Sequence, residues 1–160
     1  IDADLRKGMV HRQVGCPQEN GLSEVLTNNC KLENAIRETR IPNLSVLTCG
    51  AHTNKSTILL QNPVFKSILE SVKDSYAYVV IDTPPVLALS DAIEIAHHCG
   101  TIVLVLKHAK HTAAELEGCR KRLMMVESKL CGIIFNDVDP DAPINGSALR
   151  KQIYKYTTSD

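Results

Sequence analysis

Three acidic residues in two short segments could bind a metal ion. Asp2 and Asp4 lie in the opening sequence IDADLR, and Asp82 ends the apolar run YVVID. A carboxylate at the tip of a strand can hold Mg²⁺ directly or through water while the metal bridges the phosphates of a nucleotide. An Asp at such a tip can equally cap a turn. Asn136 ends a further apolar run, and the three acids and this amide together favour a nucleotide site.

A phosphate-binding loop should accompany such acids. In the Walker A sequence G-x-x-x-x-G-K-[ST], backbone N–H groups cradle the phosphates, and no such sequence occurs in these 160 residues. The pair Lys55-Ser56, in CGAHTNKST, has no glycine directly before the lysine. We interpret this segment as a surface loop.

The elements that must position these residues alternate along the chain. Near-continuous apolar runs, typical of strands covered on both faces, predict strands over 78–82, 101–106 and 132–136, with further strands over 43–50 and 1–3. Strands that alternate with helices predict an α/β fold with a parallel sheet and flanking helices. In such sheets ligands bind beyond the carboxyl ends of the strands, where the acids and Asn136 would converge.

Capping residues and apolar stripes predict the helices between these strands. Pro63 begins a helix over 63–73 that carries an apolar stripe. Ser90 is expected to cap a helix over 91–98, and Thr112 with Glu115 forms a capping box for one over 112–128. Shorter helices are expected over 21–27 and 31–38.

Composition excludes several classes of protein. Lys+Arg and Asp+Glu are 18 each, and aromatic residues are 4% with no Trp, so we expect no nucleic-acid partner. The apolar runs are too short to cross a bilayer. The six cysteines form no C-x-x-C motif and fit no zinc spacing, which indicates reduced thiols in a cytosolic protein. The histidine pairs 97–98 and 108/111 lack acids or cysteines at ligand spacing.

Several motifs in order together resemble a known family. IDADLRKG, GLSEVL, SYAYVVIDTPPVLALSDA, GTIVLVLKHAKHT and GIIFN are similar to the cytoplasmic kinase domain of the bacterial tyrosine kinases (BY-kinases), autokinases of capsule and exopolysaccharide synthesis and export. The resemblance implies a P-loop NTPase fold of the MinD/ParA-like kind. It also implies ATP and Mg²⁺ as cofactors and transfer of phosphate to tyrosine.

The resemblance also implies roles for individual residues. IDADLR corresponds to the Walker A′ motif, with Asp2 and Asp4 near the metal and the γ-phosphate, Asp4 as the preferred base, and Arg6 as its arginine. Asp82 corresponds to the Walker B acid, which holds Mg²⁺ through water. Asn136 is similar to the residue that reads the adenine edge. These roles name the catalytic residues Asp4, Asp2 and Arg6, and the magnesium ligands Asp82, Asp4 and Asp2.

The family further implies a substrate, partners and a location. Its tyrosine acceptors lie in a C-terminal cluster that a neighbouring subunit of a ring phosphorylates, and Tyr154 and Tyr156 are the candidates here. A membrane-embedded activator, fused or separate, would hold the domain at the inner face of the plasma membrane. We expect residues 1–138 to form the C-terminal part of the ATP-binding domain and 139–160 to form a flexible tail.

The sequence departs from the family at several positions. The strand and Walker A loop that the family places before IDADLR are expected to be missing from the fold, so the chain alone should bind ATP weakly and be inactive as a kinase. The family's PPNPSELL loop is TNKSTILL here, with Ile58 in place of an acid, and Ala77 replaces a usual Asp. Two alternatives stay open: a MinD/ParA-type ATPase, and a non-catalytic phospho-acceptor or ring subunit.

Overall fold

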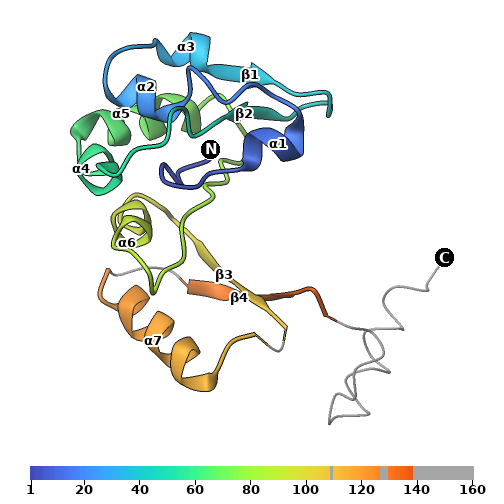
Figure 1. The fold of residues 1–160 in the computed structure, drawn as a ribbon, viewed down its shortest axis with the longest axis vertical. Coiled ribbons are helices and arrows are strands. Elements are labelled where there is room, and N and C mark those ends of the chain that lie inside the picture. Colours follow the sequence, from blue (N-terminus) through green and yellow to red (C-terminus); the bar gives the residue numbers. More distant parts are fainter. Residues whose placement is uncertain (109, 127–129, 139–160) are drawn as a thin grey trace, which may run out of the picture.

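A computed structural model describes residues 1–108, 110–126 and 130–138 of the chain. Its elements, in chain order, are α1 (Val10–Val14), α2 (Leu22–Leu26), α3 (Leu32–Ala35), β1 (Ile36–Glu38), β2 (Ser45–Leu47), α4 (Ser56–Leu60), α5 (Pro63–Lys73), α6 (Asp91–Ala96), β3 (Ile102–Lys107), α7 (Ala113–Met124) and β4 (Leu130–Asn136). They form two lobes, an upper one from α1 to α5 and a lower one from α6 to β4 (Figure 1).

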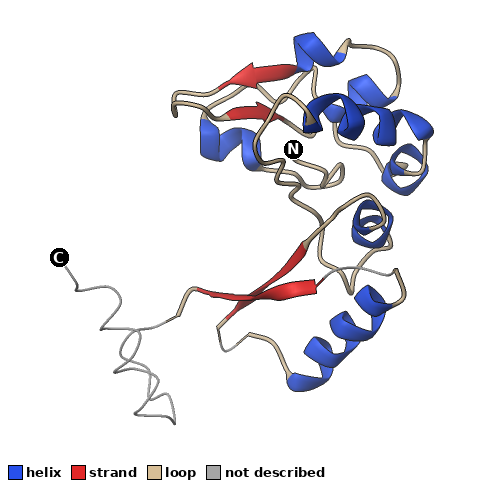
Figure 2. Cartoon of the chain, turned by 180° about the vertical axis from the view of Figure 1, so that it is seen from behind, coloured by secondary structure: helices blue, strands red, loops and turns tan. Residues whose placement is uncertain are grey.

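The α/β class is confirmed, and parallel pairing occurs at two places. β3 and β4 pair in parallel, with Leu104 opposite Ile133 and Lys107 opposite Asn136, and α7 is their crossover helix (Figure 1). A parallel bridge joins Asp2 to Asp82. β1 and β2 pair antiparallel in the upper lobe, and the two strand pairs lie in different lobes (Figure 2).

One helix and one strand differ from the elements that the sequence predicts. The helix expected over 31–38 ends at Ala35, and the following residues form β1 because they pair with β2 across a turn in which Asn43 has a φ of 61°. The strand expected over 78–82 is reduced to the single bridge at Asp82. Its side chains are expected to be covered on both faces, yet Tyr78 is 89% and Val80 is 78% exposed.

A groove explains this exposure. It has a volume of about 1530 Å³ and is lined on one side by Tyr78–Asp82 and on the other by residues 102–106 of β3. The 80–82 segment bonds to residues 1–3 through the backbone groups of Val80 and Asp82. Within the described ranges, the facing edges of this segment and of β3 have no backbone partner. The predicted parallel sheet is therefore open along this groove.

The helices with local capping signals match expectation best. α5 has the predicted bounds, and the Asn62 side chain accepts a hydrogen bond from Val64 N at its start. α7 begins with the predicted Thr112–Glu115 capping box and ends at Met124. α6 follows Ser90, but the Ser90 side chain makes no capping hydrogen bond and the helix ends at Ala96.

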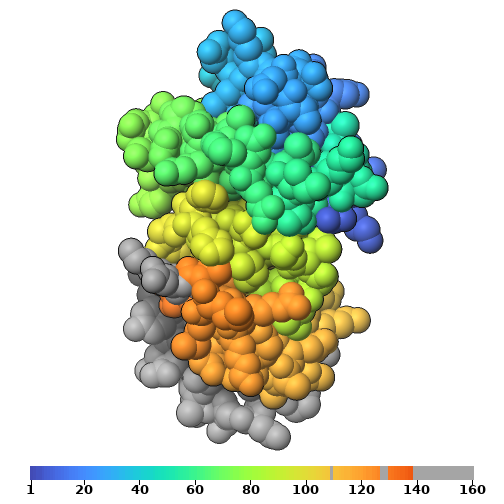
Figure 3. Space-filling view, turned by 90° about the vertical axis from the view of Figure 1, so that its left-hand side faces the viewer, coloured from blue at the N-terminus to red at the C-terminus, as the bar shows by residue number. Residues whose placement is uncertain are grey.

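The larger core lies in the upper lobe. Phe65 and Ile68 of α5 pack there with Leu5, Leu22 and other apolar residues. α6 contacts both α4 above it and α7 below it, and its residues lie between the green and orange parts of the surface in Figure 3. α6 thus connects the two lobes. None of the helices in the described ranges is long and apolar enough to cross a membrane.

Candidate functional site

The IDADLR segment and the 80–82 segment lie side by side. Ala3 N donates to Asp82 O and Asp82 N donates to Ile1 O, both at 2.9 Å, while Asp2 N donates to Leu47 O at 2.9 Å on the other side. The chain therefore runs through residues 1–3 as a bridge between β2 and the 80–82 segment. This pairing brings together Asp2 and Asp82, which are 80 positions apart in the sequence.

The acids of IDADLR differ in their surroundings. Asp2 has no exposed surface, and its carboxylate accepts from Asp4 N at 3.2 Å and from Val10 N at 3.1 Å. Asp4 is half-buried, and its Oδ1 accepts from Arg6 N at 3.1 Å and Lys7 N at 2.9 Å, which caps the turn over 5–7. Asp4 and the exposed Asp82 are the acids that solvent can reach.

Burial and mutual repulsion perturb this acidic group. Burial raises the pKa of Asp2, and the amide hydrogen bonds from Val10 and Asp4 offset only part of that rise. The pKa of Asp82 is raised by partial desolvation and then by the negative charges of Asp2 and Asp4. A cation held beside these carboxylates would relieve the repulsion.

Mg²⁺ fits this arrangement of residues. It needs only one or two carboxylates and retains several waters. Asp82 offers an exposed carboxylate, and Asp4 Oδ2 has no partner among the described residues. The donor set is all oxygen, which is the set that Mg²⁺ prefers.

The repulsion predicts that Asp82→Asn stabilises the protein. Removing one charge beside Asp2 and Asp4 should raise the free energy of unfolding in urea by about 0.5 kcal/mol, a size discounted for the exposure of Asp82. Asp74→Asn, at an exposed carboxyl after α5, serves as the control. If Asp82→Asn destabilises the protein relative to this control, the Asp82 carboxylate contributes more through its favourable contacts than it costs through repulsion.

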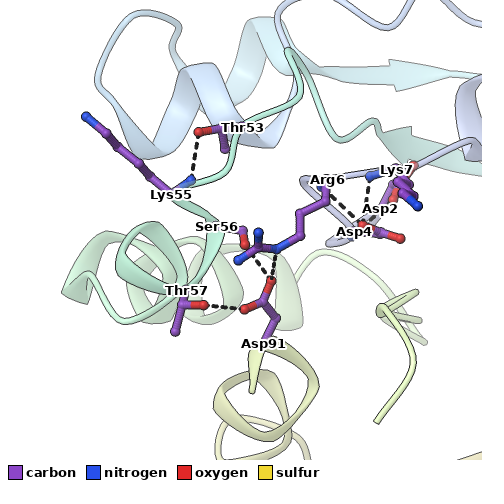
Figure 4. Close-up of polar contacts among 9 residues, drawn as sticks. All are labelled: Asp2, Asp4, Arg6, Lys7, Thr53, Lys55, Ser56, Thr57 and Asp91. Carbon is purple, nitrogen blue, oxygen red and sulfur yellow. Dashed lines mark hydrogen bonds and ion pairs between the residues drawn. The ribbon is translucent and has the colours of Figure 1, made fainter. Parts of the chain in front are cut away.

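Arg6 lies in a second polar cluster, which the sequence did not indicate. Its Nε contacts Asp91 Oδ2 at 3.3 Å, and the same carboxylate accepts from Ser56 Oγ and Thr57 Oγ1, each at 2.5 Å. Asp91 is fully buried at the start of α6 (Figure 4). Burial alone would raise the pKa of Asp91, but the hydrogen bonds from Ser56, Thr57 and Arg6 together lower it.

This cluster corrects the interpretation of Lys55-Ser56 as a surface loop. Lys55 is exposed and its side chain points away from the cluster (Figure 4), but Ser56 is fully buried and begins α4. In the sequence, the cluster is marked only by Asp91 of the SDA motif. Because an Asp is common at the start of a helix, this residue alone did not point to a cluster. The carboxylate joins α4 and α6 to the IDADLR turn.

The remaining predicted site residues are less closely connected. Asn136 ends β4, is exposed, and its backbone oxygen accepts from His108 N at 2.9 Å. Across the described ranges, no hydrogen bond joins Asn136 to Asp2, Asp4 or Asp82, and its Oδ1 accepts instead from Asp137 N at 2.9 Å. Tyr154 and Tyr156, with the rest of the predicted tail, lie outside the described residues. Tyr78, at the start of the expected 78–82 strand, is exposed in the groove.

A family model and a sequence relative match most of the chain. The model of the AAA domain family (AAA_31) matches residues 1–130. The tyrosine-protein kinase ptk of Acinetobacter johnsonii is 38% identical over 138 residues, which are 86% of this chain and 19% of that protein. The chain therefore spans about a fifth of the length of this relative.

Two solved structures define the fold. The kinase domain of the Escherichia coli tyrosine kinase ETK matches with a TM-score of 0.82 and 34% identity, covering 86% of this chain and 54% of that one. The cell division ATPase MinD of Pyrococcus furiosus matches with a TM-score of 0.58 at 19% identity. This second match shows a shared fold alone.

Proposed function

Because the chain belongs to the bacterial tyrosine kinases of the AAA domain family, we propose that it forms the acid-bearing part of an ATP-dependent protein-tyrosine kinase. The observation that carries the proposal is the bridge between Asp2 and Asp82. It joins the proposed Walker A′ and Walker B segments through backbone hydrogen bonds, so the two acids project from neighbouring positions on adjacent segments.

The roles of the acids follow from their exposure. Asp82 holds Mg²⁺ through water, and Asp4, through its free Oδ2, holds the metal or accepts the proton of an incoming tyrosine hydroxyl. Asp2 contributes its charge from beneath them and positions Asp4 through the Asp4 N–H hydrogen bond. When bound, the metal neutralises charge on the transferring phosphoryl group. Arg6 orients the turn through Asp91, and Asn136 contacts the adenine.

The substrate and partners belong to the same proposal. Tyr154 and Tyr156 accept phosphate from a neighbouring subunit in a ring, and the kinase acts in exopolysaccharide or capsule synthesis and export. A membrane-embedded activator, fused or separate, holds it at the inner face of the plasma membrane. The similarity to proteins named as tyrosine kinases supports this assignment over a MinD/ParA-type ATPase, because the match to MinD is much weaker in sequence.

We expect these 160 residues alone to bind ATP at least tenfold more weakly than a kinase domain that carries a Walker A loop and to form no phosphotyrosine. The reason is that no Walker A sequence occurs among them, and the backbone cradle of that loop provides most phosphate contacts. Titration with a fluorescent ATP analogue in Mg²⁺ measures the difference. Robust phosphotyrosine formation by the 160-residue chain would contradict the expectation.

The kinase assignment itself is tested in the complete gene product. Asp4→Asn should reduce phosphotyrosine formation from ATP and Mg²⁺ by roughly 10²–10⁴-fold, the usual contribution of a general base, while Glu70→Gln on the exposed face of α5 leaves it unchanged. ATP hydrolysis without phosphotyrosine would favour the ATPase alternative. Phosphorylation of Tyr154 and Tyr156 by another kinase, with no nucleotide bound, would favour a non-catalytic acceptor.

A further inference from the structure

Asp2, His11 and Cys49 form a compact cluster of three different donor types. One ligand atom from each, a carboxylate oxygen, an imidazole nitrogen and a sulfur, lies within 4.8 Å of the others. Asp2 and Cys49 are fully buried and His11 is half-buried. In the parts of the chain that the structure describes, no other group of three metal-capable side chains is as compact.

The histidine of this cluster has an unpaired buried atom. His11 Nδ1 is removed from solvent and has no hydrogen-bond partner, and it is the one buried side-chain nitrogen or oxygen in this state among the described residues. A buried polar atom without a partner costs about 1–3 kcal/mol. The imidazole that carries this atom clusters with a thiol and a carboxylate, and the combination points to a bound cation.

The donor types select the chemical class of that ligand. Nitrogen and sulfur donors suit Zn²⁺ and related transition metals, whereas Mg²⁺ takes oxygen donors. Zinc sites commonly have three protein ligands and a water molecule in the fourth position. We propose that Asp2, His11 and Cys49 bind one Zn²⁺-class divalent cation, at a position distinct from the Mg²⁺ position at Asp4 and Asp82.

The surroundings are consistent with such a site. Each Asp2 oxygen accepts one amide hydrogen bond and keeps a second lone pair for the cation. Gln18 Nε2 lies 3.7 Å from Cys49 Sγ and donates to Gly50 O at 2.8 Å, so it can orient the sulfur as a neighbour of the ligand shell.

Charge is balanced when the cation binds. Cys49 Sγ loses its proton to solvent as it forms the metal–sulfur bond, and Asp2 binds the cation as a carboxylate. The two negative charges then neutralise the divalent cation, which a buried site requires. The IDADLR turn, α1 and the end of β2 are thereby joined by one ion.

Metal titration of the purified, reduced protein tests the site. We expect one equivalent of Zn²⁺ to compete with a chromophoric chelator, and Co²⁺ to give a thiolate charge-transfer absorption band. His11→Gln and Cys49→Ala should each weaken Zn²⁺ binding at least tenfold and remove that band. The controls are His52→Gln and Cys16→Ala, whose side chains are outside the cluster; both should bind as the unmodified protein does.

Equal Zn²⁺ affinity in all four variants, or no charge-transfer band in the folded unmodified protein, would overturn the proposal. His11 is partly exposed on the five-residue helix α1, so we expect His11→Gln to keep the circular dichroism spectrum of the unmodified protein. If Cys49→Ala unfolds, the Zn²⁺ affinity of His11→Gln alone tests the proposed site. Zn²⁺ should also raise the Tm of the unmodified protein but not of His11→Gln. These readouts do not depend on kinase activity.

Discussion

Asp91→Ala is expected to lower the free energy of unfolding by roughly 3 kcal/mol, because it removes the buried acceptor of one guanidinium group and two hydroxyl groups. Arg6 would lose its ion pair, and Ser56 Oγ, which is fully buried, would be left without the acceptor at 2.5 Å. The loss is a large share of the 5–15 kcal/mol that stabilises a typical domain. Urea denaturation followed by circular dichroism measures it.

Two control variants separate the charge from the shape of Asp91. Asp91→Asn keeps an acceptor for one hydroxyl and should cost about half as much. Lys66→Ala breaks an exposed ion pair with Glu70 in α5 and should cost less than about 0.5 kcal/mol. If Asp91→Ala costs no more than Lys66→Ala, the Asp91 carboxylate does not hold α4 and α6 to the IDADLR turn.

The pH dependence of the Asp91→Ala effect has a defined sign. The pKa of Asp91 is lower in the folded protein than its usual value, so its ionised form stabilises the fold. This contribution is fully present above the unfolded pKa of about 3.9 and is lost as the pH falls through the folded pKa. The difference in stability between the unmodified protein and Asp91→Ala should therefore be constant near neutral pH and shrink on acidification.

Gly8→Ala is the second substitution for which we expect a large effect. A Cβ atom at Gly8 would lie 2.5 Å and 2.6 Å from the two carboxylate oxygens of Asp2 and 2.6 Å from Asp4 O. Because Asp2 is fully buried, neither its side chain nor the backbone of Asp4 can move aside freely. We expect a loss of about 2–3 kcal/mol in the free energy of unfolding, typical of overpacking a tight site.

Gly100→Ala is the matched control, since a Cβ atom there meets no atom within 4 Å. Thermal unfolding of the two variants should differ clearly, with Gly100→Ala within about 0.5 kcal/mol of the unmodified protein. Gly8→Ala should also weaken Zn²⁺ binding, because it displaces the Asp2 carboxylate. Equal melting temperatures for the two variants would show that the loop over 5–9 yields at little cost.

Local signals in the sequence predicted the helices that carry their own caps. α5 has the expected bounds because Asn62 and Pro63 define its start, and α7 begins as predicted because Thr112 and Glu115 are three residues apart. β1 was missed because its strand conformation depends on pairing with β2. That pairing is a tertiary interaction that overrides the helical pattern of the local sequence.

The site was predictable only where a motif marked it. The proximity of Asp2 and Asp82 follows from adjacent parallel strands, and the structure has that bridge. The Asp91 cluster and the Asp2–His11–Cys49 cluster were missed, because each collects residues from separate elements of the fold. No spacing rule along the sequence applies to such sets, and the absence of C-x-x-C did not exclude a thiol ligand.

The groove between Tyr78–Asp82 and β3 leaves the β3–β4 pair without a sheet connection to the rest of the molecule. No backbone hydrogen bond of the described residues crosses the groove, whereas α6 is held to the upper lobe through Asp91 and Ile95. The β3–β4 pair can therefore open without disrupting the upper lobe. Amide hydrogens of β3 should then exchange with solvent by a different opening reaction from those of the upper lobe.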